Sequence, residues 1–181
     1  MRNKTTDFEI LGRKSIYSGR IFALNRVEAR LPDGQVRQFD VIQHNGAVAL
    51  LVLDDEENLW LVRQYRIATG KSLLEIPAGS LEPGETPAEC AAREIREETG
   101  MASRSITHLA SFYLAPGYSS EYLHIFLARD LYPSPLAGDA DEFLDIQKVP
   151  AREALAMAQR GEFADGKTYA ALLLLQPYLN R

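Results

Sequence analysis

The sequence predicts an α+β fold, with helices on the faces of a mixed β-sheet and an antiparallel β extension at the N-terminus. Short apolar runs separated by turn residues indicate strands through most of the chain. One capped amphipathic helix interrupts them, and the last third turns helical. Strands with a few interspersed helices favour α+β packing. At 181 residues and 46% hydrophobic content, the chain can build one domain with a sizeable core.

The first strands are expected in the N-terminal extension. The runs 21–31 and 36–44 flank Pro32-Asp33-Gly34, which is a turn signal, and so predict an antiparallel hairpin. The stretch from His44 to Ala47 is the one plausible boundary. We therefore divide the chain into an extension, residues 1–45, and a main domain, residues 46–181.

The main domain is expected to begin with a second hairpin. Its strands, 47–53 and 59–65, flank the acidic turn 54–58. Further strands are predicted at 73–76, 106–114, 122–128 and 145–149. Two helices are expected after them, one opening at residues 150–153 and one over 169–179.

The central helix carries the clearest end signals in the chain. Thr86 is a good N-cap, Pro87 suits the first helical position, and Glu89 completes a Thr-x-x-Glu capping box. Gly100 should end the helix in a left-handed conformation. Within the helix, Cys90 is expected to be a small packing residue rather than an activated thiol, because no histidine neighbours it in sequence.

Three glutamates share one face of this helix. Glu94, Glu97 and Glu98 stand at i, i+3 and i+4, so their carboxylates repel by about 0.2–0.5 kcal/mol per pair. A divalent cation removes that cost, and hard cations such as Mg²⁺ or Mn²⁺ prefer oxygen ligands. The alternative is an ordinary solvated charged face.

Composition narrows the classes of ligand and location. The net charge is −5, and the segment from Gly79 to Met101 supplies most of it, with six glutamates against two arginines. An acidic protein does not attract extended nucleic acid, so small anionic substrates are favoured. No apolar run resembles a signal peptide or a membrane span, which makes a cytoplasmic enzyme without membrane partners the default expectation.

The spacing around the helix resembles the signature of the Nudix hydrolases. Gly79 is followed after five residues by Glu85, and after seven more by the run Arg93-Glu94-Ile95-Arg96-Glu97-Glu98-Thr99-Gly100-Met101. All the defining positions match, so chance agreement is negligible. The resemblance implies an α/β/α sandwich and metal-dependent cleavage of compounds built on a nucleoside diphosphate.

The resemblance also implies roles for individual residues. Glu94 and Glu98 would be the principal ligands of Mg²⁺, with Mn²⁺ as an alternative, and Glu85 and Glu97 would assist. The backbone carbonyl of Ala78 would join the coordination. Arg93 would orient the glutamates, and we count it among the catalytic group for that reason.

Three other segments resemble the ADP-ribose pyrophosphatase branch of the family. Pro116 lies 16 residues after Gly100, where that branch often carries a proline. The strand end 62–66 contains two arginines that could clamp phosphates. The segment 17–21 in that branch helps to form a homodimer and reaches the partner's site.

By this analogy the substrate contacts can be assigned. Arg66 would contact the diphosphate, with Arg63 beside it. Arg20 and Phe39 would hold the nucleoside from the other subunit. Further pocket candidates are Glu82 and Glu121.

The general base has two candidates. Glu142, in the acidic loop 137–142, resembles the loop glutamate that acts as base in the ADP-ribose branch. Glu97 competes, because other Nudix branches use a glutamate of the signature helix. A metal-activated water needs only a carboxylate of modest basicity, so either suffices.

The predicted reaction converts ADP-ribose to AMP and ribose 5-phosphate. GDP-mannose or another nucleotide sugar is the alternative substrate. A nucleotide sensor without turnover is disfavoured because all four signature carboxylates, Glu85, Glu94, Glu97 and Glu98, are present. An RNA-end hydrolase would need a basic groove, whereas the pI is about 5.3.

Overall fold

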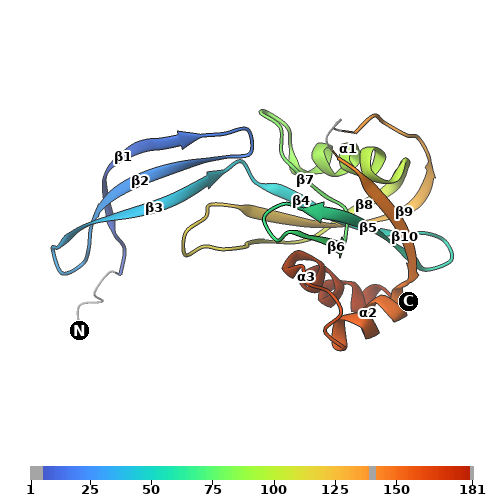
Figure 1. Cartoon of the computed structure of the whole chain (residues 1–181). Coiled ribbons are helices and arrows are strands. Elements are labelled where there is room, and N and C mark those ends of the chain that lie inside the picture. Colours follow the sequence, from blue (N-terminus) through green and yellow to red (C-terminus); the bar gives the residue numbers. More distant parts are fainter. Residues whose placement is uncertain (1–5, 139–141, 180–181) are drawn as a thin grey trace. The chain divides into compact units, whose positions relative to one another are not determined.

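The computed structural model describes residues 6–138 and 142–179, which form two compact units (Figure 1). The first unit takes its described residues from 1–46 and 113–122. The second takes them from 47–112 and 123–181.

The first unit is built on a three-stranded antiparallel sheet in the order β1-β2-β3. Its strands are β1 (Glu9–Ser18), β2 (Phe22–Arg30) and β3 (Val36–His44). The β2–β3 hairpin confirms the prediction, with Gly34 at φ 87° in the turn. Strand β1 was not predicted from the sequence. It is exposed along its whole length and carries two register irregularities, so it shows no clean alternation of buried and exposed residues.

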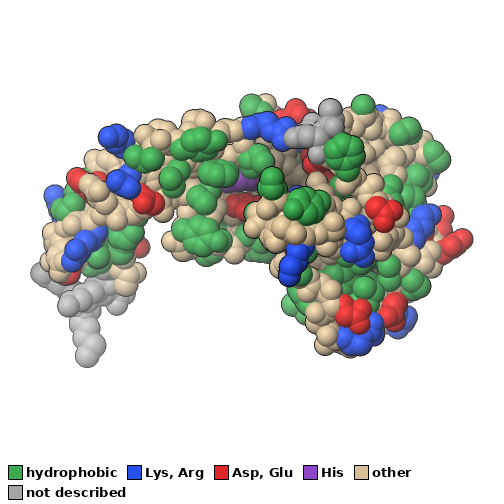
Figure 2. Space-filling model, in the orientation of Figure 1, with side chains coloured by type: hydrophobic (Ala, Val, Ile, Leu, Met, Phe, Trp, Pro, Cys, Tyr) green, Lys and Arg blue, Asp and Glu red, His purple; other side chains and the backbone are tan. Residues whose placement is uncertain are grey.

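Many large apolar side chains of the first unit face solvent. Among the hydrophobic residues described in this unit, only Val27 and Ala29 are buried. Exposed ones include Phe8, Ile10, Ile16, Tyr17, Ile21 and Phe22. Figure 2 shows hydrophobic side chains on the surface of this unit.

The segment 113–122 completes the first unit through backbone bonds to β3. Ile42 N–H donates to the Tyr118 carbonyl at 2.8 Å, and Ser120 N–H donates to the Ile42 carbonyl at 2.9 Å. The rings of Tyr113 and Tyr122, at the two ends of the segment, lie 4.7 Å apart between centroids.

The second unit contains a mixed sheet of seven strands, which confirms the predicted fold class. The central order is β10-β5-β4-β9-β8, with β6 paired to β5 and β7 to β4. The β4–β9 pair is parallel, whereas the β4–β5 pair is antiparallel. The strands are β4 (Ala47–Leu53), β5 (Asn58–Arg66), β6 (Lys71–Glu75), β7 (Ala78–Ser80), β8 (Met101–Tyr113), β9 (Tyr122–Pro133) and β10 (Leu144–Pro150).

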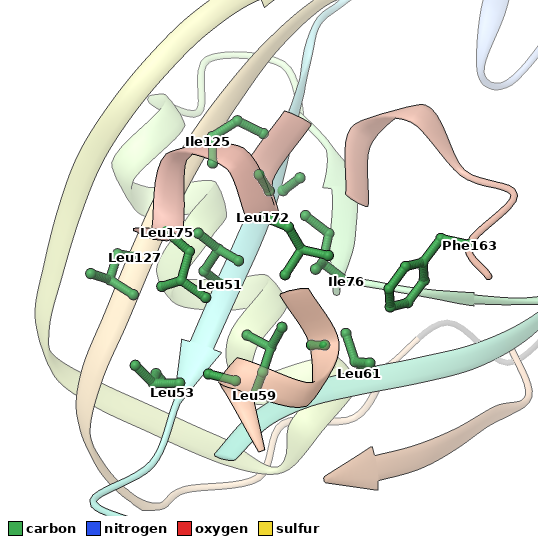
Figure 3. Close-up of a cluster of buried hydrophobic side chains, with 14 of the residues drawn as sticks. Leu51, Leu53, Leu59, Leu61, Ile76, Ile125, Leu127, Phe163, Leu172 and Leu175 are labelled. Atoms are coloured by element: carbon green, nitrogen blue, oxygen red, sulfur yellow. The ribbon is translucent and has the colours of Figure 1, made fainter. Parts of the chain in front are cut away.

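Helices cover both faces of this sheet and so form three layers. Helix α1 (Pro87–Thr99) packs on one face, and α2 (Ala151–Gln159) and α3 (Gly166–Leu175) pack on the other. All seven residues of β4 are buried, and they serve the two faces alternately. Leu51 and Leu53 join the core beneath α2 and α3 (Figure 3). Leu50 and Val52 pack against α1.

Several element ends differ from the predicted ones. Strand β8 begins at Met101 rather than residue 106, because the polar run after Met101 still pairs in the sheet. Strand β9 continues to Pro133, and α3 spans Gly166–Leu175 before the 3₁₀ turn η1 (Gln176–Tyr178), where we predicted one helix over 169–179. None of the described helices is both long and apolar enough to span a bilayer.

Candidate active site

Helix α1 begins and ends where its sequence signals predict. Thr86 Oγ1 accepts from the Glu89 backbone N–H at 3.3 Å, and Glu89 Oε2 accepts from the Thr86 N–H at 2.8 Å. Gly100 adopts φ 72° and donates its N–H to the Arg96 carbonyl. Cys90, Ala91 and Ile95 are fully buried against the sheet. This docking fixes the neighbouring glutamates at the edge of the packed face.

Cys90 packs in the core, in agreement with its expected role. Its side chain is buried, and burial raises the pKa of the thiol well above its ordinary value. It carries no disulfide. Its sulfur accepts from Arg93 Nη2 at 3.3 Å, so it also helps to support that guanidinium.

Arg93 joins three of the four signature carboxylates. Its Nε and Nη2 donate to the two oxygens of Glu85 at 2.8 and 2.9 Å. Its Nη1 donates to Glu94 Oε1 at 2.7 Å and to Glu97 Oε2 at 2.8 Å. Nη2 also donates to the Ser80 carbonyl at 3.2 Å. The guanidinium therefore holds Glu85, Glu94 and Glu97 in one cluster.

Glu85 and Glu94 respond to this cluster in opposite ways. The Arg93 bonds lower the pKa of Glu85 to about 2. Burial raises the pKa of Glu94 to about 7, although Arg93 partly opposes that shift. The two pKa shifts differ in sign because the Glu94 side chain is less accessible to solvent than that of Glu85. Loss of hydration favours the protonated form of a carboxyl group.

Gly79 on β7 makes room for the Glu94 carboxylate. A Cβ atom at this position would collide with both carboxylate oxygens and the carboxyl carbon. Its φ is not in the left-handed region, so space rather than backbone conformation requires the glycine. The first glycine of the signature thus has a steric reason in this chain.

Glu98 is the least satisfied carboxylate of the group. Its side chain is 5% exposed, and Oε1 accepts from the Ala78 N–H at 3.4 Å. Its Oε2 is buried and has no hydrogen-bond partner among the described residues. Burial, with the nearby charge of Glu94, raises the pKa of Glu98 well above its ordinary value. An oxygen of this kind is costly unless a cation or donor meets it.

The donor set fits a hard divalent cation. It consists of carboxylate oxygens next to the backbone of β7, and hard cations prefer oxygen ligands. The buried Glu98 oxygen, which has no partner among the described residues, is the strongest indication that a cation binds here. Within the described ranges, no three acidic, histidine or cysteine side chains are gathered as ligands around one point. The Arg93 guanidinium lies among three of these carboxylates and bonds to oxygens of Glu94 and Glu97.

Arg66 belongs to the same side of the sheet as the glutamates. It makes a bidentate pair with Glu75, and its charge also lowers the pKa of Glu98, after the larger effects that raise it. Arg63 is three residues away on β5, so it points to the opposite face. Arg63 lines an open groove of about 530 Å³ together with Tyr65, Glu142 and Phe143.

The two candidates for the general base differ in exposure to solvent. Glu142 is exposed, and its charge is among the smaller effects that raise the pKa values of Glu94 and Glu98 after burial. Glu97 is partly buried and bonded to Arg93. The rest of the predicted acidic loop, residues 139–141, lies outside the described residues. Glu82 is exposed, and its backbone N–H donates to Glu85 Oε2 at 3.0 Å.

The remaining predicted substrate residues belong to the first unit. Arg20 lies in the turn between β1 and β2. Phe39 on β3 is 38% exposed, and its ring lies 5.7 Å from that of Phe8. Glu121 precedes β9, and its carbonyl accepts from the Leu114 N–H at 3.2 Å. Their contacts with substrate stay predictions.

The sequence did not predict an ion network beside Arg66. Glu75 is buried and ion-paired to both Arg66 and Lys167, and Lys167 also pairs with Asp165 at 3.0 Å. These residues are far apart in the chain. The Asp165-x-x-Thr168 capping pattern was the one signal available, and it marks only the start of α3.

Comparisons with known proteins agree with this geometry. The family model for the NUDIX domain matches residues 43–172. An ADP-ribose pyrophosphatase of Bacillus subtilis (strain 168) is 35% identical over 96% of this chain and 95% of that protein. A methanol dehydrogenase activator of Bacillus methanolicus is 38% identical over 90% of this chain and 89% of that protein.

Two further matches bear on the fold and on the substrate class. A GDP-mannose pyrophosphatase of Citrobacter koseri is 35% identical over 78% of this chain and 80% of that protein. A crystal structure of an ADP compounds hydrolase superposes with a TM-score of 0.83 at 28% identity, covering 95% of this chain and 94% of that one.

Proposed function

Because the chain belongs to the Nudix hydrolase family, we propose that it hydrolyses the diphosphate bond of ADP-ribose to give AMP and ribose 5-phosphate. The observation that carries this proposal is the full-length similarity to an ADP-ribose pyrophosphatase. GDP-mannose is the second candidate, and the relative named for it matches a smaller share of this chain. Enzymes of this family generally need a divalent metal ion.

Magnesium is the proposed metal, with manganese as the alternative. Glu94, Glu98, Glu85 and the Ala78 carbonyl would hold it, and it would supply positive charge for the substrate diphosphate. The buried, unpaired Glu98 oxygen supports this assignment. Arg93 then serves as an orienting group, since its bonds fix three of the carboxylates.

Arg66 and Arg63 have different parts in the proposal. Arg66 is on the glutamate side of the sheet, which supports a contact with the diphosphate. Arg63 points to the opposite face of the sheet, so its proposed substrate contact comes from the family resemblance alone. The pocket roles of Glu82, Glu121, Arg20 and Phe39 come from the family resemblance.

Glu142 is the proposed general base. Its carboxylate would accept a proton from the attacking water, because it is exposed at the edge of the site and close enough to affect Glu94 and Glu98. Glu97 is the rival, but one of its oxygens already accepts from Arg93 at 2.8 Å. A Glu142→Gln variant that keeps wild-type turnover while Glu97→Gln loses it would reverse this assignment.

A homodimer is proposed as the working form, in the cytoplasm. The apolar side chains exposed on the first unit support it, for example Ile10 at 51% and Tyr17 at 57% exposure. A second copy of the chain is the proposed cover for this surface. Light scattering should give a dimer, and a monomer that still turns over substrate would refute the proposal.

The deciding experiment measures nucleoside monophosphate release from a panel with and without Mg²⁺. The panel contains ADP-ribose, GDP-mannose, NADH, diadenosine polyphosphates and nucleoside triphosphates. Metal-dependent preference for ADP-ribose supports the proposal. Preference for GDP-mannose would retain the metal site and change the substrate, and silence across the panel would favour a binding protein without turnover.

A further inference from the structure

The Arg66 side chain reaches its partner by running back along the sheet. On the β5–β6 ladder Arg66 lies opposite Lys71, whereas Glu75 lies opposite Val62. Arg66 nevertheless donates from Nε to Glu75 Oε1 at 2.9 Å and from Nη2 to Oε2 at 2.8 Å. The guanidinium is therefore drawn away from its own end of the strand. The bonds to Glu75 raise the pKa of Arg66 most, and the negative charge of Glu98 raises it further. Arg66 therefore interacts electrostatically with one of the carboxylates of the candidate metal site.

Glu75 is itself held from helix α3. Lys167 Nζ pairs with Glu75 Oε2 and, at 3.0 Å, with Asp165 Oδ2. Asp165 caps α3 by accepting from the Thr168 N–H at 3.0 Å. Thr168 Oγ1 in turn accepts from the Ile76 N–H at 3.1 Å, directly after Glu75. Both the carboxylate and the adjoining backbone are thus fixed from the same helix.

This arrangement leaves Arg66 able to bind an anion. The Glu75 pair uses two of the five guanidinium N–H groups, and the side chain remains 37% exposed. The network holds two cations, Arg66 and Lys167, and two carboxylates, Glu75 and Asp165, so Arg66 offers an anion its free, exposed N–H groups rather than an excess of charge. A planar guanidinium held on one edge suits bidentate binding of phosphate oxygens on the other.

We propose that Glu75, held by Lys167, is a positioning residue that orients Arg66 for the diphosphate group of the substrate. The inference rests on the proposed function, which supplies that diphosphate. A purely structural role would instead tie α3 to the sheet and leave ligand binding unchanged.

The test measures binding of inorganic pyrophosphate with Mg²⁺ by calorimetry for the wild type, Arg66→Met, Glu75→Asp and the double variant. Glu75→Asp keeps a negative charge in the network but is one methylene shorter, so it should lose the two-point pairing with Arg66. We expect each single variant to weaken binding by about tenfold, as for loss of a charge-assisted hydrogen bond. The double variant should bind within about twofold of Arg66→Met, because Glu75 acts through Arg66.

Arg160→Met is the matched control. Arg160 also pairs with two carboxylates, Glu153 and Glu162, but at the end of α2. Its loss should leave pyrophosphate binding unchanged. Thermal melts of every variant show which ones fold, and Glu75→Gln, which keeps the size of the side chain, is the second variant if Glu75→Asp does not fold.

Three results would overturn the inference. They are wild-type binding in the Glu75 variants, effects of Glu75 and Arg66 that multiply in the double variant, and failure of the wild type to bind pyrophosphate. The proposed function fails separately, if pyrophosphate binding follows the expected pattern while no nucleoside diphosphate compound is hydrolysed. In that case Glu75 still positions Arg66 for a diphosphate group, and the proposed hydrolase activity is wrong.

Discussion

Two regions of the second unit each bury a glutamate, and they treat it differently. Glu75 is 1% exposed and ion-paired to Arg66 and Lys167. Glu98 is 5% exposed, and one of its oxygens has no partner among the described residues. Burial favours the protonated form of both, but the two cations lower the pKa of Glu75 below its ordinary value, whereas that of Glu98 is raised.

The contrast separates a carboxylate that the fold itself neutralises from one that it does not. Burying an ion is tolerable when the fold itself supplies the opposite charge, as it does for Glu75. Where the fold does not supply that charge, the carboxylate is stabilised only by a charge from outside the chain. Glu98 is therefore the better marker of the metal site, although both carboxylates are almost inaccessible to solvent.

The largest expected effect comes from Glu98→Gln. Loss of this ligand should lower kcat/KM for ADP-ribose by about 10²- to 10³-fold, because the charge that stabilises the transition state is no longer held in place. The melting temperature without metal should not fall, since the variant removes an unpaired buried charge. Turnover at the wild-type rate would exclude Glu98 from the metal site.

Lys167→Met should lower stability more than any other of these variants. It leaves Glu75 with one cation instead of two, so the free energy of unfolding should fall by about 2–3 kcal/mol. Urea unfolding measures this loss, with Arg160→Met as the exposed control. If Lys167→Met is as stable as the control, the buried pair is not what stabilises this region.

A smaller effect is expected from Gly79→Ala. The added Cβ displaces the Glu94 carboxylate, and turnover should fall by about tenfold, since misplacing one ligand weakens the site. Gly166→Ala is the matched control, because a Cβ there meets no atom within 4 Å. Equal activity of the two variants would show that Glu94 can move without consequence.

The smallest effect concerns pH. The folded-state pKa of Glu75 is lowered, so its contribution to stability is present above the ordinary carboxyl pKa of 4.5 and is lost as pH falls below it. Urea unfolding from about pH 6 to about pH 3 should therefore show a steeper loss in the wild type than in Glu75→Gln. Parallel curves would mean that Glu75 does not titrate with folding.

Local signals predicted the parts of the site that lie close in sequence. The capping box and Gly100 gave the bounds of α1, and the repeat of glutamates gave the shared face. Strand β7 escaped prediction because three residues, Ala78–Ser80, carry no periodicity. Its position against β4 is nevertheless what brings Gly79 to Glu94.

Contacts between distant segments could not be read from the sequence. Nothing in the run around Glu75 indicates that its carboxylate meets Lys167, because that pairing depends on where α3 docks on the sheet. The pairing of Arg66 with Glu75 could not be predicted either, because it does not follow the strand register. The register of β5 and β6 alone would place Arg66 beside Lys71.

The distance along the chain between Glu75 and Lys167 has a consequence for biosynthesis. The two residues are 92 positions apart, and helix α1 lies between them in the chain. On the ribosome, α1 emerges long before α3, and Lys167 can support Glu75 only after α3 has emerged. A nascent chain can therefore gather the carboxylates around Arg93 before Lys167 arrives to support Glu75 and, through it, Arg66.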